Sequence, residues 1–418
     1  MHRFLLFLIP VAALLAYTLW SRTRRNPVHF AIRPGVDFDS LMRSMAGLTW
    51  GRLTEGNRVE IVQNSGFFDA LFEDVARARH SVHLETFLWE DGAISERVTD
   101  ALAARGRDGI EVRVLVDQRG AKQISPTVAA RLRAGGCNFR VYHRMRFREF
   151  GWYNHRDHRK IAVIDGRIGY TFGHGIADMW GGTPEEPSGW RDTAARFEGP
   201  IVNELQTAFF DNWTKVTGEA IGGREYFPKL ERAGETPAHV AYLAPSETAS
   251  AVQRLYYFAI AAAREEIILQ NPYFLPSSQA MQLFAEARKR GVAISIMLPT
   301  ATTSDFSIVQ HASHYFYGPL LAMGARVWEH TRCGLHQKVM IIDRQWCSIG
   351  STNFDPRSFR LNDEITVAMC DRDVAAELHR AFEEDLGGAE EWTLARFAAR
   401  TWGHRWQDRV SALAKRQL

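Results

Sequence analysis

The fold is decided by two octapeptides, HRKIAVID at residues 158–165 and HQKVMIID at residues 336–343. Both read His-x-Lys-x4-Asp, with four apolar residues between the lysine and the aspartate. Such an apolar run predicts a buried strand, on which residues two apart share a face. The histidine and lysine of each copy are therefore expected to point into one pocket, as a nucleophile and a cation beside a phosphate. One copy is a weak signal, but two copies at matching places in a repeat are a strong one.

The sequence around the motifs repeats as well. In both copies an amphipathic helix precedes a short apolar strand, and a second helix with a basic end and a glycine precedes a buried strand. The matching elements are the helices 66–79 and 249–263, the strands 82–87 and 267–274, and the strands 112–116 and 294–298. Alternating helices and strands predict α/β layers. We expect two α/β/α units, related by a pseudo-twofold axis, that share one active site.

This pattern divides the 418 residues into six segments. They are a membrane anchor at 1–25, a connecting segment at 26–57, a first half at 58–218, a linker at 219–237, a second half at 238–386 and a basic amphipathic tail at 387–418. The linker is rich in glycine, proline and charge. The net charge of +3 excludes no class of partner.

The N-terminus predicts a transmembrane helix. Residues 4–20 contain no charge, a length at the short end of what spans a bilayer. Arg22, Arg24 and Arg25 follow, against Arg3 before the run, which favours a cytoplasmic main body. The alternative is a cleaved signal peptide, but no small-x-small cleavage site follows the apolar run. A periplasmic catalytic face stays open because the charge asymmetry is small.

The cysteines predict neither disulfides nor a metal site. Cys137, Cys333, Cys347 and Cys370 form no Cys-x-x-Cys pair and no Cys/His cluster with zinc spacing. We expect reduced thiols, some of them buried, and no metal or cofactor.

The paired motif resembles that of the phospholipase D superfamily, over roughly residues 58–386. Within it, GSTNFDPRSFRLNDE at 350–364 resembles the second half-site of bacterial cardiolipin synthases. WRDT at 190–193, followed by EGP at 198–200, resembles their first half-site, and NPYFLP at 271–276 is similar to a family loop. The resemblance implies transfer of a phosphatidyl group to phosphatidylglycerol in a bacterial plasma membrane. The donor would be phosphatidylglycerol or phosphatidylethanolamine, no nucleic acid is expected, and the oligomeric state is open.

The resemblance also implies roles for the motif residues. One histidine attacks phosphorus and becomes phosphohistidine, and the other acts as general acid and then base. His158 is expected to be the nucleophile and His336 the acid/base, although the pseudo-symmetry leaves the reverse open. Lys160 and Lys338 are expected to bind the phosphate oxygens. Ser351 and Asn353 are expected to assist them.

Each imidazole needs an acceptor for its second nitrogen. Glu364 is expected to orient His336, and Asp192 to orient His158. Asp165 and Asp343 complete the catalytic motifs, but they lie far along the strand from each histidine. A structural hydrogen-bonding role is therefore favoured for both.

The first copy departs from the family pattern after its motif. Gly-Ser-x-Asn is common there, whereas this chain has Gly173, His174 and Gly175 after Phe172. The glycine N–H groups remain available to a phosphate. For His174 we expect only a loop or packing role.

Two basic stretches have open interpretations. Residues 142–148 alternate cations with apolar residues, as either a surface for anionic headgroups or a solvated loop. The tail at 392–418 combines arginines with tryptophans, as either an amphipathic helix on a membrane or a terminal helix packed on the domain.

Two other functions compete with lipid synthesis. A phospholipase D-type hydrolase, acting on lipid or nucleic acid, would use the same residues with water as the acceptor. A nuclease would not need the anchor, and the chain lacks a long basic stripe with stacking aromatics. A non-enzymatic membrane scaffold is disfavoured because both copies retain the histidine and the lysine.

Overall fold

A computed structural model of the chain describes residues 30–33, 36–142, 155–183, 186, 189–242 and 250–413. The chain divides into two compact units, Met1–Ile32 and Arg33–Leu418, and every element below belongs to the second. The predicted anchor at 1–25 lies outside the described residues. Within them, no helix combines the length and the hydropathy that crossing a bilayer requires.

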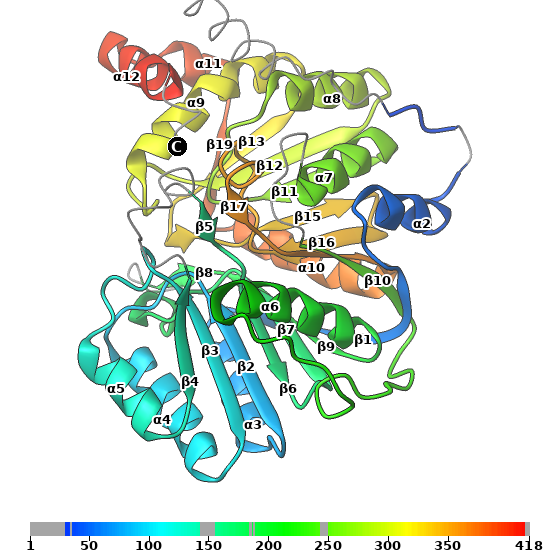
Figure 1. Cartoon of the computed structure of the whole chain (residues 1–418). Helices are drawn as coiled ribbons and strands as arrows, with labels where there is room; N and C mark the ends of the chain where they lie inside the picture. Colours follow the sequence, from blue (N-terminus) through cyan, green and yellow to red (C-terminus); the bar gives the residue numbers. More distant parts are fainter. Residues whose placement is uncertain are drawn as a thin grey trace, which may run out of the picture. The chain divides into compact units, whose positions relative to one another are not determined.

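The strands repeat one arrangement twice (Figure 1). The first copy has the order β1-β9-β7-β6-β2-β3-β4, and the second has β10-β18-β16-β15-β11-β12-β13 with β19 added outside β13. The first-copy strands are β1 Thr54–Gln63, β2 Ser81–Thr86, β3 Glu111–Asp117, β4 Asn138–Tyr142, β6 Ile161–Ile164, β7 Ile168–Phe172 and β9 Thr193–Glu198. The second-copy strands are β10 Thr236–Ala241, β11 Glu266–Gln270, β12 Ala293–Pro299, β13 Arg326–His330, β15 Val339–Ile342, β16 Trp346–Gly350, β18 Thr366–Cys370 and β19 Ala389–Trp392. The copies join where β1 and β10 pair antiparallel, so the predicted duplication of an α/β unit is confirmed.

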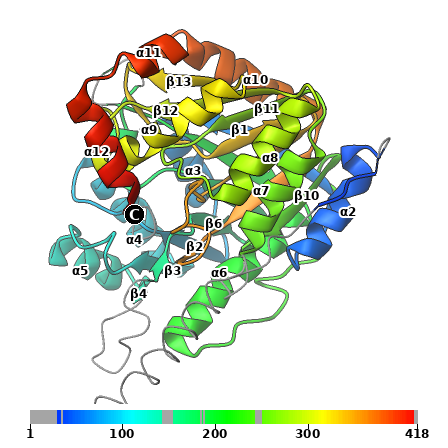
Figure 2. The same ribbon diagram turned by 90° about the horizontal axis from the view of Figure 1, so that it is seen from above.

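The helices repeat in the same way. Equivalent pairs are α3 Gly66–Ala76 with α7 Ala251–Ala262, α4 Ala93–Arg107 with α8 Ser278–Lys289, α5 Pro126–Ala134 with α9 Ser307–Ala322, and α6 Ile201–Thr217 with α10 Arg372–Leu386. Outside the repeat are α2 Phe38–Leu48, the short 3-10 helix η2 Asp178–Trp180, α11 Leu394–Ala398 and α12 Trp402–Leu413. Viewed from above, α11 and α12 lie along α9, which is 16 residues long against 9 in its counterpart α5 (Figure 2).

The two copies share one hydrophobic core. Leu205 and Phe209 of α6 and the equivalent Leu378 and Phe382 of α10 belong to the same buried cluster, together with strand residues of both copies. This cluster also explains why a leucine followed four residues later by a phenylalanine occurs in both α6 and α10. Because neither copy buries this surface alone, the halves fold as one unit.

The cysteines are free thiols, as predicted. Cys137, Cys333 and Cys347 are buried and Cys370 is partly exposed. Burial raises the pKa of Cys137, Cys333 and Cys370 to about 11, which leaves these thiols protonated and unreactive.

Candidate active site

His158 is placed by a short parallel ladder that joins the two copies. β5, Arg156–Asp157, pairs in parallel with β17, Asn362–Asp363. The next residue of one strand is His158 and the next of the other is Glu364, so the two side chains lie side by side. The Nδ1 atom of His158 lies 3.0 Å from Oε2 of Glu364, and its backbone N–H donates to the Asp363 carbonyl at 2.9 Å.

A second ladder places His336 in the equivalent way. β8, Trp190–Arg191, pairs in parallel with β14, Gly334–Leu335. The residues that follow are Asp192 and His336. The Nδ1 atom of His336 lies 3.0 Å from Oδ2 of Asp192, and its backbone N–H donates to the Arg191 carbonyl at 2.9 Å.

The orienting carboxylates are therefore crossed between the copies. The sequence-based assignment of Glu364 to His336 and of Asp192 to His158 is wrong. Each ladder takes one strand from each copy, so a histidine meets the carboxylate of the opposite motif. Residue spacing within one copy contains no information about this exchange.

The motif strands are also shorter than predicted. β6 and β15 consist only of the four apolar residues, and each histidine and lysine precedes its strand. The two side chains are still brought together, because Nζ of Lys338 lies 3.0 Å from Nε2 of His336. Nζ of Lys160 donates to the carbonyl of His158 at 3.1 Å.

Burial keeps both imidazoles neutral. Burial lowers the pKa of His158 to about 4, against an opposing effect of Glu364. Burial and the Lys338 ammonium lower the pKa of His336 to about 3, which Asp192 opposes. A neutral imidazole that donates from Nδ1 to a carboxylate keeps a lone pair on Nε2. Either histidine is thus prepared to attack an electrophile.

Two buried lysines supply the positive charge. Lys160 and Lys338 are each 1% exposed, and burial lowers their pKa values to about 8 and about 7. An ammonium group without an anion is unfavourable in such surroundings. A phosphate between the lysines would restore their charged form, which suits the predicted role of both.

Ser351 contacts the orienting carboxylate. Its hydroxyl donates to Oε2 of Glu364. Ser351 therefore helps to position His158, in addition to the phosphate contact predicted for it. Asn353 is buried, and no described group donates to its Oδ1 atom, which leaves that oxygen available to a hydrogen-bond donor.

In the first copy a tryptophan takes the place of that serine. A Cβ atom on Gly173 would lie 2.1 Å from Oδ1 of Asp192, and one on Gly175 would lie 2.8 Å from the Trp180 ring. Gly173 thus makes room for Asp192 and Gly175 for Trp180, whose Nε1–H donates to Oδ2 of Asp192 at 2.9 Å. The rings of Trp180 and His336 are 5.3 Å apart, edge to face. Sequence reasoning missed Trp180, although the absent serine signalled that another donor was needed.

His174 has the packing role expected of it. It is fully buried, its ring lies 4.7 Å from that of Phe67, and its Nε2–H donates to the Asn64 carbonyl at 2.8 Å. It also acts on the active site at a distance. Burial raises the pKa of Asp192, but His174, His336 and Lys338 hold it well below its usual value.

Asp165 and Asp343 have equivalent structural roles. Asp165 accepts hydrogen bonds from the backbone N–H groups of residues 79–81, where β2 begins. Asp343 accepts from those of residues 264–266, where β11 begins. Both aspartates have left-handed backbones, with φ of 55° and 52°. Neither contacts the histidine of its own motif among the contacts found in the described residues.

Most of the basic stretch 142–148 lies outside the described residues, which resume at 155. Tyr142 itself is buried and donates to Oδ2 of Asp363 at 2.5 Å, so it does not face headgroups. It supports the residue that precedes Glu364.

The chain is similar to known proteins over most of its length. The family profile described as "Cardiolipin synthase, PLD-like domain" matches residues 71–176 and 257–386. The chain is 30% identical to a cardiolipin synthase of Oceanobacillus iheyensis, over 86% of this chain and 75% of that protein. It is 31% identical to a minor cardiolipin synthase of Bacillus subtilis, over 81% of this chain and 83% of that protein. Its fold is similar to that of a phosphatidylserine synthase of Haemophilus influenzae, with a TM-score of 0.70 at 12% identity, over 90% of this chain and 99% of that chain.

Proposed function

Because the chain belongs to the cardiolipin synthase family of the phospholipase D superfamily, we propose that it transfers a phosphatidyl group from a phospholipid to the free hydroxyl of phosphatidylglycerol. The product is cardiolipin. Glycerol leaves if the donor is phosphatidylglycerol, and ethanolamine leaves if it is phosphatidylethanolamine. The observation that carries the proposal is the pair of buried histidine–carboxylate contacts, each built across both copies, beside two buried lysines.

In the first half-reaction, Nε2 of His158 attacks phosphorus. The bond from phosphorus to the headgroup oxygen breaks, and His336, which takes up a proton when the substrate binds, gives that proton to the departing alkoxide. Glu364 accepts the Nδ1–H of His158 and stabilises the positive charge that develops on the phosphorylated ring. His336 ends this step neutral, held by Asp192.

In the second half-reaction, the phosphatidylglycerol hydroxyl replaces the headgroup alcohol. Neutral His336 takes the hydroxyl proton as the oxygen attacks phosphorus, and the bond from phosphorus to His158 breaks. Both histidines then have the protonation state in which the reaction began. Lys160 and Lys338 stabilise the charge on the non-bridging oxygens in both transition states.

The proposed place of this reaction is the bacterial plasma membrane. The uncharged run at 4–20 and the arginines that follow it support a single N-terminal anchor with the catalytic unit in the cytoplasm. Protease protection in sealed inverted vesicles tests this topology. A catalytic unit that trypsin cannot reach in those vesicles is periplasmic.

Thin-layer chromatography of labelled lipids tests the reaction. Membranes containing the full chain receive labelled phosphatidylglycerol, beside His158→Ala and a matched control, His404→Ala, which removes an exposed histidine. We expect cardiolipin from the wild type and the control but not from His158→Ala. Phosphatidic acid as the only product would make the protein a hydrolase, and equal activity of His158→Ala would exclude this site.

A further inference from the structure

Exposed apolar side chains gather on one part of the surface. Among the described residues, eight large hydrophobic side chains are strongly exposed, and seven of them belong to α9, α11, α12 or the residue that caps α9. These seven are Phe306, Ile308, Tyr315, Leu394, Trp402, Trp406 and Val410. The eighth, Trp50, follows α2, which Figures 1 and 2 both show far from α12. Such a cluster on a water-facing surface indicates a binding site.

The helix α12 turns its apolar stripe away from the protein. Asp408 and Ala412 are buried against α9. Trp402, Trp406 and Val410 lie at intervals of four residues on the opposite face, and the two tryptophans are 79% and 58% exposed. A helix that only packed on the domain would direct these rings inward. Their exposure disagrees with the packed alternative for this part of the tail.

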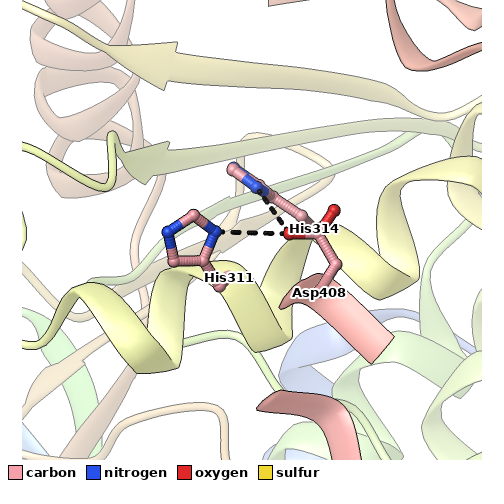
Figure 3. Close-up of side chains that lie close together, drawn as sticks. All are labelled: His311, His314 and Asp408. Atoms are coloured by element: carbon pink, nitrogen blue, oxygen red, sulfur yellow. Dashed lines mark hydrogen bonds and ion pairs between the residues drawn. The ribbon is translucent and has the colours of Figure 1, made fainter. Parts of the chain in front are cut away.

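An ion-pair cluster holds α12 in this orientation (Figure 3). Oδ1 of Asp408 lies 3.3 Å from Nδ1 of His311 and 3.5 Å from Nδ1 of His314, and Arg400 contacts its other oxygen at 2.5 Å. Nε2 of His314 lies 2.7 Å from Glu329. Burial alone lowers the pKa of His314, but the Asp408 and Glu329 carboxylates outweigh it and raise the pKa to about 9.

The charges of this cluster cancel without a metal ion. The three ligand atoms of His311, His314 and Asp408 lie close enough to hold one. However, protonated His314 and Arg400 already balance Asp408 and Glu329. The cluster is therefore best explained as the contact that fixes the C-terminal helix on α9.

The same surface carries unbalanced positive charge. The described residues 392–413 contain four arginines against one acidic residue, Asp408. No described carboxylate lies within 4 Å of Arg405 or Arg409, which stand on α12 beside the tryptophans. Tryptophan with unpaired arginine is the composition that binds anionic lipid surfaces.

The surface leads to the active site. Phe306 begins it at the start of α9, where its ring lies 6.4 Å from that of Tyr273. The Tyr273 hydroxyl donates to Asp305 at 2.5 Å. Burial raises the pKa of the Asp305 carboxyl, which the Tyr273 hydroxyl and the Lys338 ammonium oppose. Asp305 is thus within electrostatic reach of the phosphate-binding lysine and directly precedes the first exposed aromatic residue.

We propose that α9, α11 and α12 form a docking surface for an anionic phospholipid bilayer, which holds the active site at the level of the headgroups. The proposal rests on the proposed function, because a lipid acceptor in the bilayer gives the docking its purpose. It is distinct from the N-terminal anchor. An anchor keeps the chain at the membrane, whereas this surface sets the orientation of the catalytic unit.

The test uses the full chain in vesicles that contain phosphatidylglycerol with brominated acyl chains, which quench tryptophan at the membrane. The variant is Trp402→Ser with Trp406→Ser, and the matched control is Trp50→Ser. We expect the double variant to lose quenched fluorescence that the control retains. On vesicles its kcat/KM should fall on the order of 10-fold through lost orientation. On short-chain phosphatidylglycerol below its micelle concentration, kcat/KM should be unchanged.

Three results would overturn the docking surface. The first is equal quenching of the wild type and the double variant. The second is an equal loss of activity on vesicles and on monomeric lipid, which would indicate damage to the fold. The third is a change from dimer to monomer in detergent with no difference in quenching, which would make this face an interface between copies. Quenching that differs as expected in a protein without synthase activity would refute the proposed function and leave the docking surface standing.

Discussion

Replacing Asp192 by asparagine should disable His336 while sparing His158. The amide has the size of the carboxylate and retains one acceptor oxygen, so the buried site keeps its shape. It loses the negative charge at the 3.0 Å contact with Nδ1 of His336. Glu364→Gln is the matched change at His158, where the contact is also 3.0 Å. Each substitution thus removes one charge from one imidazole.

The size of the effect follows from the contact that is lost. A hydrogen bond to a charged group contributes about 1.5–3 kcal/mol, which corresponds to roughly 10- to 150-fold in rate. In Asp192→Asn, this free energy is lost only in the state in which His336 is protonated. The imidazolium is the form that Asp192 favours, since its carboxylate opposes the lowering of the His336 pKa.

Rapid-quench measurement of the phosphohistidine separates the two roles. A donor with p-nitrophenol as leaving group needs no proton, whereas the natural donor does. We expect Asp192→Asn to slow phosphoenzyme formation from the natural donor but not from the p-nitrophenyl ester, and Glu364→Gln to slow both. Peptide mapping must place the phosphate on His158. If it does, and Asp192→Asn still slows the activated donor, the crossed pairing is refuted.

Three further results are expected. The kcat/KM of the free enzyme should fall as the pH rises above about 4, because His336 must carry a proton to act as the acid, and should fall more steeply above about pH 7–8, as the lysines also lose their protons; no steepening from pH 7 to 9 would contradict phosphate binding by ammonium groups. Asp165→Ala and Asp343→Ala should each lower the free energy of unfolding by about 1–3 kcal/mol or more, without changing kcat per folded molecule, in denaturant titrations paired with activity assays. Gly173→Ala should abolish activity because its Cβ displaces Asp192, whereas Gly47→Ala, which meets nothing within 4 Å, should be active; an active Gly173→Ala would show that Asp192 has room to move.

The repeat and its elements were predictable because their signals are local. Helices at 66–76 and 251–262 and strands at 111–117 and 293–299 agree closely with the apolar periodicity. The length of the motif strands is overestimated from the sequence. An apolar run locates a strand, but it does not show whether the polar residues before it also pair with a neighbouring strand. His158 and Lys160 are positioned instead by β5, a strand of two residues that pairs with β17 of the other copy.

What the sequence did not predict depends on contacts between distant residues. The crossed carboxylates depend on pairing between residues that are 206 and 144 positions apart in the sequence. Trp180 is recognised only when its hydrogen bond to Asp192 is seen. The sequence of the tail permits two interpretations, because an amphipathic pattern defines two faces of a helix but does not show which face packs on the protein. In the structure Trp392 is buried while Trp402 is exposed, so each interpretation describes part of the tail.

The asymmetry of the site bears on which histidine acts as the acid. After burial, the largest cause that lowers the pKa of His336 is the Lys338 ammonium, whose Nζ lies 2.8 Å and 3.0 Å from the two ring nitrogens. For His158 the Glu364 carboxylate outweighs the Lys160 ammonium. A bound phosphate that attracts Lys338 removes more opposing charge from His336 than from His158. Substrate binding should therefore raise the pKa of His336 more than that of His158. His336 then becomes the protonated acid while His158 remains the neutral nucleophile. Proton uptake on binding a non-hydrolysable diester, measured near pH 5 where both lysines are already charged and absent in His336→Gln, would measure this shift, and uptake that persists in that variant would assign the proton elsewhere.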